Sequence, residues 1–357
     1  MRRIAVLLSV AVMAMGGAAQ AKPKWALVVH GGAGVIEKKD LSPEQDRAYR
    51  EAMTRVANTG ADVLKKGGSA LDAIEAAVRI LEDDPLFNAG RGAVFTAEGK
   101  NELDSSVMDG SNLMAGAVAG ATTTRHPISL ARAVMEKSPH VMLMGEGADE
   151  FARTQNLEQV DPSFFYTERR WQGLERELKR QGLPVPAKPA GAKPGAMAEL
   201  VHDEDGGRNA DLIDLKKKFG TVGVVALDSR GNVAAGTSTG GTTAKRWGRV
   251  GDAPIIGAGT YASNRSCAVS ATGTGEYFIR LTVARKICAL VEYKGLSLQA
   301  AADEVIQKDL TALKGDGGVI AVAPNGDMAW SFNTSGMYRA KIADGQPLTV
   351  GIYKDDP

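Results

Sequence analysis

The residues with the clearest chemical potential lie where a threonine follows a glycine at the start of an apolar run. Thr221 comes directly after Gly220 and opens the β-rich run that continues to Asp228. If the Thr221 hydroxyl cut the Gly220–Thr221 peptide bond, the new α-amine, with a pKa of about 8, could act as a general base near neutral pH. One residue would then supply both nucleophile and base. By itself, a Gly-Thr pair is more often an ordinary strand start.

Three further clusters carry groups that such a nucleophile needs. Segment 237–241 is rich in Thr and Ser, so hydroxyls such as that of Thr239 can face the nucleophile across adjacent strands. Arg249 and Asp252 lie three residues apart in a glycine-containing loop and match the α-carboxylate and α-ammonium of an amino acid. Segment 272–275 precedes a predicted helix and can form an oxyanion hole. The plainer interpretations are a polar strand end, a surface ion pair, and a helix cap or phosphate site.

The elements around these clusters are predicted from periodicity and turn residues. After Thr221 the pattern predicts strands over 221–228 and 233–237 joined by a turn, a strand near 268–270, helices over about 276–293 and 297–309, and a hairpin of 318–322 with 328–332 around an Asn-Gly turn. Earlier in the chain it predicts a strand over 25–29 that ends in a glycine turn at 30–34, a helix over 43–66, and a second helix capped by Ser69 and Asp72.

Two segments of the N-terminal half have a looser composition. The segment 81–92 leaves the second helix through Pro85 and becomes glycine-rich, so its carbonyls could surround a monovalent cation, although an ordinary loop is equally compatible. From 155 to about 220 the chain is polar and partly Pro/Ala/Lys-rich, which predicts a mobile linker that contains one charged helical candidate, Glu168 to Arg180.

The composition is that of an ordinary soluble globular protein. The chain has 357 residues, 44% of them hydrophobic, and 43 basic against 42 acidic residues give a net charge of +1. Nothing in this balance points to nucleic acid or to an anionic membrane surface as a partner.

The N-terminus has the pattern of a secretory signal peptide. A basic pair, Arg2-Arg3, precedes a short apolar stretch and an Ala-Gln-Ala sequence that ends at Ala21, so we expect residues 1–21 to be removed and the protein to be periplasmic or secreted. An oxidising compartment would allow Cys267 and Cys288 to form a bridge. One cysteine lies in a predicted strand and the other in a predicted helix, and the sequence leaves their pairing open; of the two states, we favour buried free thiols.

Taken jointly and in this order, the motifs resemble those of plant-type L-asparaginases, also called isoaspartyl peptidases. The matching segments, which span about residues 25 to 353 without the linker, are His30–Gly34, Asn88–Gly90, Glu102–Asp104, Gly220–Gly223, Thr237–Gly241, Gly248–Asp252, Thr272–Gly275 and Phe332–Arg339. The resemblance implies an α+β fold, the four-layer αββα sandwich of N-terminal nucleophile hydrolases. It also implies cleavage into an alpha chain, 22–220, and a beta chain, 221–357, which together form one domain.

The resemblance also assigns roles by position. It implies Thr221 as the nucleophile, Thr239 as the assisting hydroxyl, Thr272 and Gly273 as the oxyanion hole, Arg249, Asp252 and Gly275 as the substrate-binding residues, and Asn88 as a close neighbour of the nucleophile. The family's structural sodium loop corresponds to the backbone carbonyls of Leu81, Glu82, Asp84, Phe87, Ala89 and Arg91. The implied reaction is hydrolysis of L-asparagine and of β-aspartyl dipeptides, without a catalytic cofactor, by a dimer of αβ heterodimers. The sequence leaves the preferred substrate and potassium dependence open.

Individual motifs also suggest three other functions. A Ser-His-Asp esterase is rejected because Ser238, in a G-x-S-x-G match, needs a histidine after it, and all four histidines precede it. A glycosylasparaginase-like amidase typically has Asp before the threonine, and this chain has Gly220. A non-enzymatic exported amino-acid-binding protein would use Arg249 and Asp252 but keep its chain intact.

Overall fold

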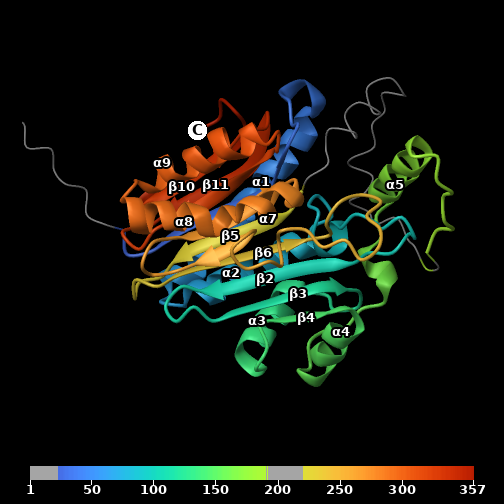
Figure 1. Cartoon of the computed structure of the whole chain (residues 1–357), viewed down its shortest axis with the longest axis horizontal. Coiled ribbons are helices and arrows are strands. Elements are labelled where there is room, and N and C mark those ends of the chain that lie inside the picture. Colours follow the sequence, from blue (N-terminus) through green and yellow to red (C-terminus); the bar gives the residue numbers. More distant parts are fainter. Residues whose placement is uncertain (1–22, 190, 192–219) are drawn as a thin grey trace, which may run out of the picture.

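The computed structural model describes residues 23–189, 191 and 220–357, and these form a mixed α and β structure (Figure 1). The larger sheet has eight strands in the order β12-β11-β1-β5-β6-β2-β3-β4, and the smaller has four in the order β10-β9-β8-β7. The strands are β1 Ala26–Gly34, β2 Leu103–Asp109, β3 Ala115–Ala121, β4 Met142–Met144, β5 Val222–Leu227, β6 Val233–Thr239, β7 Thr260–Ala262, β8 Ala268–Gly273, β9 Gly317–Val322, β10 Met328–Phe332, β11 Gly336–Ala343 and β12 Gln346–Tyr353. Apart from β3 with β4, the pairs described are antiparallel.

The helices cover the outer faces of the two sheets. Helices α1, α2 and α3 pack on the larger sheet, and α8, α9 and η5 pack on the smaller one. The bounds are η1 Lys38–Asp40, α1 Pro43–Lys65, α2 Ala70–Asp83, η2 Gly90–Gly92, α3 Pro127–Lys137, α4 Gly145–Thr154, η3 Pro162–Phe165, α5 Glu168–Arg180, α7 Gly275–Leu281, α8 Val283–Lys294, α9 Leu298–Asp303 and the π-helical η5 Glu304–Leu310.

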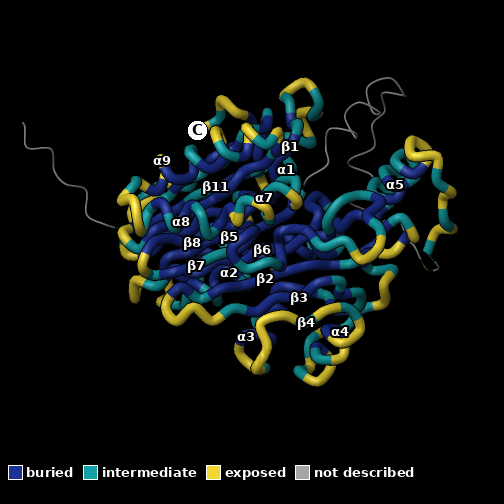
Figure 2. The backbone as a smooth tube through the Cα atoms, viewed as in Figure 1, coloured by how far each residue is buried: buried dark blue, intermediate teal, exposed yellow. Residues whose placement is uncertain are grey.

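Alternation along the strands builds separate cores on the two faces of the larger sheet. In β5, Val222 and Val224 face the helices, whereas Val225 and Leu227 face the smaller sheet. This is the period of two expected for a strand that is buried on both sides. Figure 2 shows the central strands buried, with most exposed residues on helix surfaces, on loops and on the edge strand β4.

Several predicted elements are confirmed. Ser69 accepts a hydrogen bond from the backbone N–H of Asp72, whose side chain accepts one in return from Ser69, so a capping box opens α2. The charged helical candidate is α5, and the hairpin around the Asn-Gly turn is β9 with β10. The helix predicted over 276–293 is broken, because Thr282 has a φ of 49° and separates α7 from α8.

Two predictions about segment boundaries were wrong. The expected glycine turn at 30–34 is the continuation of β1, with an irregularity in its pairing to β11 between His30 and Gly32. The linker expected over about 155–220 starts too early, because α5 packs Trp171 and Leu174 against Phe95 in a small core of its own. The remainder of that segment, residues 190 and 192–219, and the predicted signal peptide lie outside the described residues.

The preference for free thiols was also wrong. Cys267, just before β8, is bonded to Cys288 of α8. Both residues are buried, and the bridge fastens a helix to the strand that continues to Gly273. Among the described residues, no helix is both long and apolar enough to span a membrane.

We predict that the bridge stabilises the fold by limiting the unfolded chain. It closes a loop between residues 21 apart in the sequence, so a Cys267→Ser/Cys288→Ala variant is expected to lose about 3 kcal/mol of unfolding free energy. Urea unfolding of both proteins, with and without a reductant, measures this difference. The reductant should destabilise only the parent, and an unchanged parent would contradict the prediction.

Candidate active site

Three threonines point into one end of the gap between the two sheets. Val222 pairs with Ser238, so Thr221 before β5 lies opposite Thr239 at the end of β6. Side chains alternate between the two faces of a strand, so these two side chains lie on the faces that meet between the sheets, as does that of Thr272 in β8. The start of one strand and the ends of two others therefore converge at a single point.

The two predicted hydroxyls are in direct contact. Thr221 Oγ1 donates to Thr239 Oγ1 at 3.0 Å, and Thr239 Oγ1 also accepts from the backbone N–H of Gly241 at 3.0 Å. Both side chains are buried. The expectation that Thr239 faces Thr221 across adjacent strands is confirmed, and an oxygen that already accepts a backbone N–H is held in place to receive the second proton.

Asn88 holds the segments on both sides of this pair. Its backbone N–H donates to the carbonyl oxygen of Gly220 at 3.2 Å, and its carbonyl accepts from the N–H of Gly240 at 3.1 Å. Its side-chain Nδ2 donates to the carbonyl of Gly241 at 2.8 Å, while Oδ1 accepts from the N–H of Val94. The predicted neighbour of the nucleophile is thus a clamp with every polar group engaged.

The predicted oxyanion-hole residues lie across the gap on β8. Gly273 lines the same small cavity as Thr221 and Thr239, and the hydroxyl oxygen of Thr272 accepts from the N–H of Ala33 in β1 at 3.3 Å. That bond leaves the hydroxyl proton of Thr272 available as a donor. Thr274 caps α7 through its backbone, and its hydroxyl bonds Asp316.

Arg249 and Asp252 complete the cavity. Both line it, together with Gly241, Thr242 and Gly251. Asp252 is 5% exposed, and its Oδ2 has no hydrogen-bond partner among the described residues. Burial raises the pKa of this carboxyl to about 7, although the charge of Arg249 opposes the shift. An unpartnered buried carboxylate beside a guanidinium suits a ligand that carries both an ammonium and a carboxylate.

Glycine is required where this pair meets α7. A Cβ on Gly275 would lie 2.9 Å from Arg249 Nη2 and 2.9 Å from Asp252 Oδ1. The predicted substrate-binding Gly275 therefore acts by leaving room, and no side chain of its own is involved.

A buried polar network behind the threonines was missed by sequence reasoning. His30 Nε2 lies 2.9 Å from Ser270 Oγ, which is 2.7 Å from Thr237 Oγ1, and Thr237 in turn accepts from Thr260. Burial lowers the pKa of His30 to about 3, despite an opposing backbone interaction with Thr221. The imidazole is therefore neutral at physiological pH. The available signal was the clustering of Ser and Thr on alternate positions of two predicted strands.

The predicted sodium loop is joined to β6 through a side chain. The carboxylate of Glu82, fully buried, accepts from Ser238 Oγ at 2.6 Å and from the N–H of Ile128 at 3.0 Å, and burial raises its pKa. Sequence reasoning had considered its backbone carbonyl alone. Since Ser238 precedes Thr239, the loop fixes the strand end that carries the Thr239 hydroxyl. The described residues contain no cluster of His, Cys, Asp and Glu suited to a metal ion.

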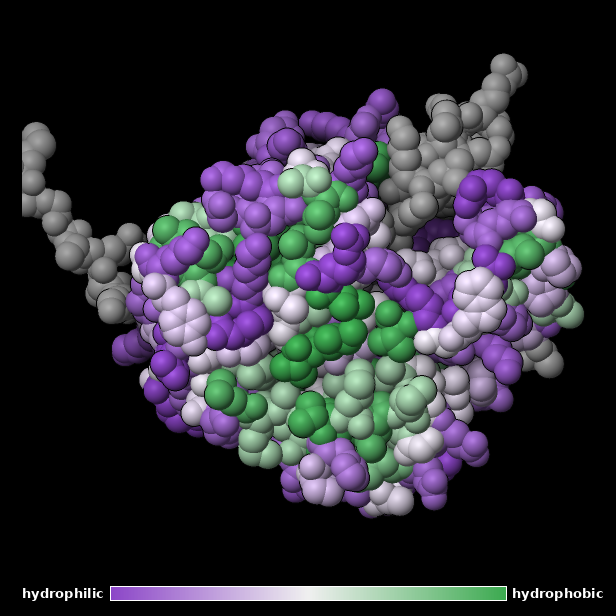
Figure 3. Space-filling view, viewed as in Figure 1, coloured by the Kyte–Doolittle hydropathy of each residue, from purple (hydrophilic) through white to green (hydrophobic). Residues whose placement is uncertain are grey.

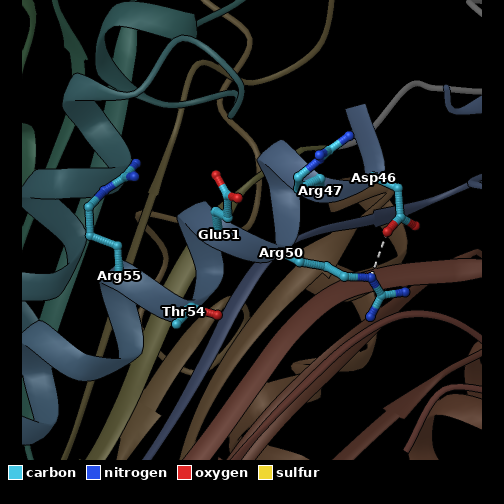
Figure 4. Close-up of a pocket in the computed structure, with 6 residues that line it drawn as sticks. All are labelled: Asp46, Arg47, Arg50, Glu51, Thr54 and Arg55. Atoms are coloured by element: carbon cyan, nitrogen blue, oxygen red, sulfur yellow. Dashed lines mark hydrogen bonds and ion pairs between the residues drawn. The ribbon is translucent and has the colours of Figure 1, made fainter. Parts of the chain in front are cut away.

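A larger hollow, of about 470 Å³, lies over the outer surface of α1 but lacks the features of a reactive site (Figure 4). Its lining comes from a single helix, and its one hydroxyl group, that of Thr54, lies inside that helix and does not follow a glycine at the start of a strand. Its basic residues are occupied by acidic partners: Arg50 bonds Asp46 at 2.7 Å, and Arg55 bonds Asp84 at 2.8 Å. The lining residues are Asp46, Arg47, Arg50, Glu51, Thr54 and Arg55.

Comparison with known proteins identifies the family of the chain. The family model described as Asparaginase matches residues 23–352. The chain belongs to the asparaginase family. It is 49% identical over 332 residues to the isoaspartyl peptidase of Escherichia coli, covering 93% of this chain and 97% of that protein. It is 48% identical to the isoaspartyl peptidase of Salmonella typhimurium (93% and 99% covered) and 40% identical to the human isoaspartyl peptidase/L-asparaginase (92% and 96% covered).

In this asparaginase-family chain, Asp252 makes stability depend on pH. Its pKa is near 7 in the folded protein and near 4 in the unfolded chain, so the folded state binds more protons between these values and stability falls as pH rises through that window. We expect Asp252→Asn to unfold like the parent at pH 4 and to be more stable by about 1 to 4 kcal/mol at pH 8. Urea unfolding at both pH values measures this difference. Equal stability at pH 8 would show that Asp252 is not a costly buried charge.

Proposed function

We propose that the chain is a self-cleaving hydrolase that converts L-asparagine to L-aspartate and ammonia and also hydrolyses β-aspartyl dipeptides. One observation carries the proposal: Thr221, Thr239, Arg249, Asp252 and Gly273 line a single cavity. The printed names of the relatives, isoaspartyl peptidase and L-asparaginase, support the same pair of substrates.

Both substrates present the same groups to this cavity. Each has a free α-carboxylate for Arg249 and a free α-ammonium for Asp252, and each has its scissile carbonyl on the β-carbon. Binding the ammonium gives Asp252 the partner that it lacks, so the cost of its buried charge falls when substrate enters. The two ionic contacts orient the substrate, and the remaining wall brings its β-carbonyl to Thr221.

The reaction follows from the groups around Thr221. Thr221 Oγ1 attacks the β-carbonyl carbon of the substrate, while the α-amine of Thr221, freed by the cut before it, takes the hydroxyl proton. The Thr272 hydroxyl and the Gly273 N–H donate to the oxyanion. The C–N bond of the substrate breaks, and ammonia or the amino acid leaves with a proton from the α-ammonium of Thr221. Water, deprotonated by the α-amine, then attacks the ester and releases L-aspartate. No cofactor takes part in these steps.

Maturation uses the same hydroxyl on the chain itself. Thr221 Oγ1 attacks the carbonyl carbon of Gly220, the amide becomes an ester, and water cleaves the ester to a Gly220 carboxylate and a Thr221 amine. The carbonyl oxygen of Gly220 already accepts the N–H of Asn88, a contact that supports polarisation of this bond. Cleavage yields the alpha chain, 22–220, and the beta chain, 221–357.

The wider setting is proposed with it. The layers of helices and sheets are taken to be the αββα sandwich of N-terminal nucleophile hydrolases. Residues 1–21 act as an export signal, and the Cys267–Cys288 bridge suits an oxidising compartment, the periplasm or the exterior.

Two αβ units associate as a dimer. Exposed Met142 and Met144 on the edge strand β4 provide an apolar surface for this, in a region where Figure 3 shows hydrophobic side chains gathering.

A structural sodium ion fits the loop 81–91 by its backbone. A Cβ on Gly90 would lie 2.2 Å from the carbonyl oxygen of Glu82, and a Cβ on Gly92 would lie 2.0 Å from that of Phe87, so these carbonyls lie against glycines where a side chain would not fit. The carbonyls of Leu81, Glu82, Asp84, Phe87, Ala89 and Arg91 would hold the ion, which would order the loop that carries Asn88.

Replacing the nucleophile tests the central claim. We expect Thr221→Ala to remain one chain and to hydrolyse neither asparagine nor β-aspartyl dipeptides, whereas Thr221→Ser, which keeps a hydroxyl, should retain partial cleavage and activity. Denaturing mass spectrometry and ammonia release measure the two effects. A Thr221→Ala protein with full activity would refute the mechanism, and an uncut, inactive parent would favour the binding-protein alternative.

Gly275 gives a second test. The Cβ of Gly275→Ala would press on Arg249 and Asp252, so we expect kcat/KM to fall at least about tenfold, chiefly through KM, which corresponds to ~1.4 kcal/mol. Gly147→Ala is the matched control, because Gly147 lies in α4 and an added methyl group there would meet no atom within 4 Å beyond its chain neighbours and its own helix backbone. Unchanged kinetics of Gly275→Ala would remove Gly275 from the substrate site.

A further inference from the structure

The guanidinium of Arg249, which the substrate's α-carboxylate would bind, is already paired with a carboxylate of the protein, that of Glu276. Arg249 Nε donates to Glu276 Oε1 at 3.0 Å, and Arg249 Nη2 donates to Glu276 Oε2 at 3.2 Å. This two-bond arrangement is the one that a guanidinium forms with an α-carboxylate. Glu276 was not among the residues that the sequence motifs singled out.

The two partners differ in their freedom to move. The side chain of Arg249 is 18% exposed, and that of Glu276 is 57% exposed. Arg249 is enclosed by small residues: a Cβ on Gly251 would lie 2.7 Å from its Nη1, and one on Gly275 would lie 2.9 Å from its Nη2. Glu276, in the first turn of α7, has Arg249 as its described ion-pair partner. Glu276 can therefore turn towards solvent while the guanidinium stays in place.

The charges at the site favour an exchange. Partial burial would raise the pKa of Glu276, but the hydrogen bonds and charge of Arg249 outweigh burial and hold that pKa below its usual value, so the carboxylate is ionised at neutral pH. Glu276 also lies close enough to oppose the ionisation of Asp252. When the substrate binds, its α-carboxylate would replace the carboxylate of Glu276 on Arg249, so one anion is exchanged for another. The ammonium of the substrate would offset the charge of Asp252.

We propose that Glu276 sets the affinity of the site for α-carboxylate ligands by standing in for the substrate's α-carboxylate on Arg249 until the substrate displaces it. This inference rests on the proposed function, because it takes Arg249 as the carboxylate-binding residue. Glu276 keeps the guanidinium paired and oriented in the free enzyme. A ligand that lacks an α-carboxylate brings no group to displace Glu276, so its affinity does not depend on this ion pair.

The experiment compares the parent with Glu276→Gln and Glu276→Ala. One arm measures kcat and KM for L-asparagine and a β-aspartyl dipeptide. The other measures binding of L-aspartate and of β-alaninamide, which is asparagine without its α-carboxylate, by calorimetry. Glu304→Gln is the control, because it removes an exposed acid that pairs with Lys308 and does not contact Arg249.

We expect both Glu276 variants to lower KM and the dissociation constant of L-aspartate by about two- to fivefold, the size expected for a partly exposed ion pair, with kcat nearly unchanged. The affinity for β-alaninamide should not improve, and Glu304→Gln should match the parent. A higher KM in both variants would mean that Glu276 only orients Arg249 and would overturn the proposal, as would equal gains for both ligands. Because calorimetry needs no turnover, an inactive parent that still binds L-aspartate would refute the proposed function alone.

Discussion

The antiparallel pairing of β5 with β6 is the constraint on which the site depends. Because Val222 pairs with Ser238, the hydroxyls of Thr221 and Thr239 meet at the same end and on the same face of the sheet. The contacts of Asn88 then fasten the chain before β5 and the chain after β6 to one residue. A shift of one residue in this register would turn one threonine towards the helices and separate the pair.

The gap between the sheets combines satisfied and unsatisfied polar groups. Behind the threonines, hydroxyls of Thr237, Thr260 and Ser270 bond one another, so that part of the interface is rigid and needs no ligand. At its open end, Asp252 is buried with an oxygen that has no partner among the described residues. A buried carboxylate oxygen without a partner in the wall of the cavity is expected where a charged ligand is to be bound.

Local signals in the sequence predicted much of the fold. The capping pair Ser69 and Asp72 identified the start of α2, and alternation identified β5 and β6. Alternation failed where close packing replaces bulky side chains. The sequence of β3 is almost entirely Ala and Gly, and a Cβ on Gly116 would lie 2.0 Å from the carbonyl oxygen of Ala131 in α3. Such a strand lacks the β-branched and aromatic residues that mark strands in a sequence.

The sequence predicted which residues form the site better than it predicted the contacts among them. Arg249 and Asp252 could be chosen because their charges suit an amino acid, and the structure brings both to the cavity of Thr221. The partner of Arg249 could not be foreseen, since Glu276 is 27 residues away and meets it only when α7 is docked. The bond between Cys267 and Cys288 was missed for the same reason: pairing depends on how a helix lies on a strand.

The position of β1 has a consequence for the products of a cut before Thr221. This strand, from the N-terminal part of the chain, pairs with β5 on one side and with β11 on the other, and both neighbours come from the C-terminal part. In the same sheet, β2 pairs with β6. Strands of the two polypeptides would therefore alternate within one sheet. Neither could leave without opening the middle of a sheet, so severing the backbone would alter the chemistry at Thr221 while the molecule remained in one piece.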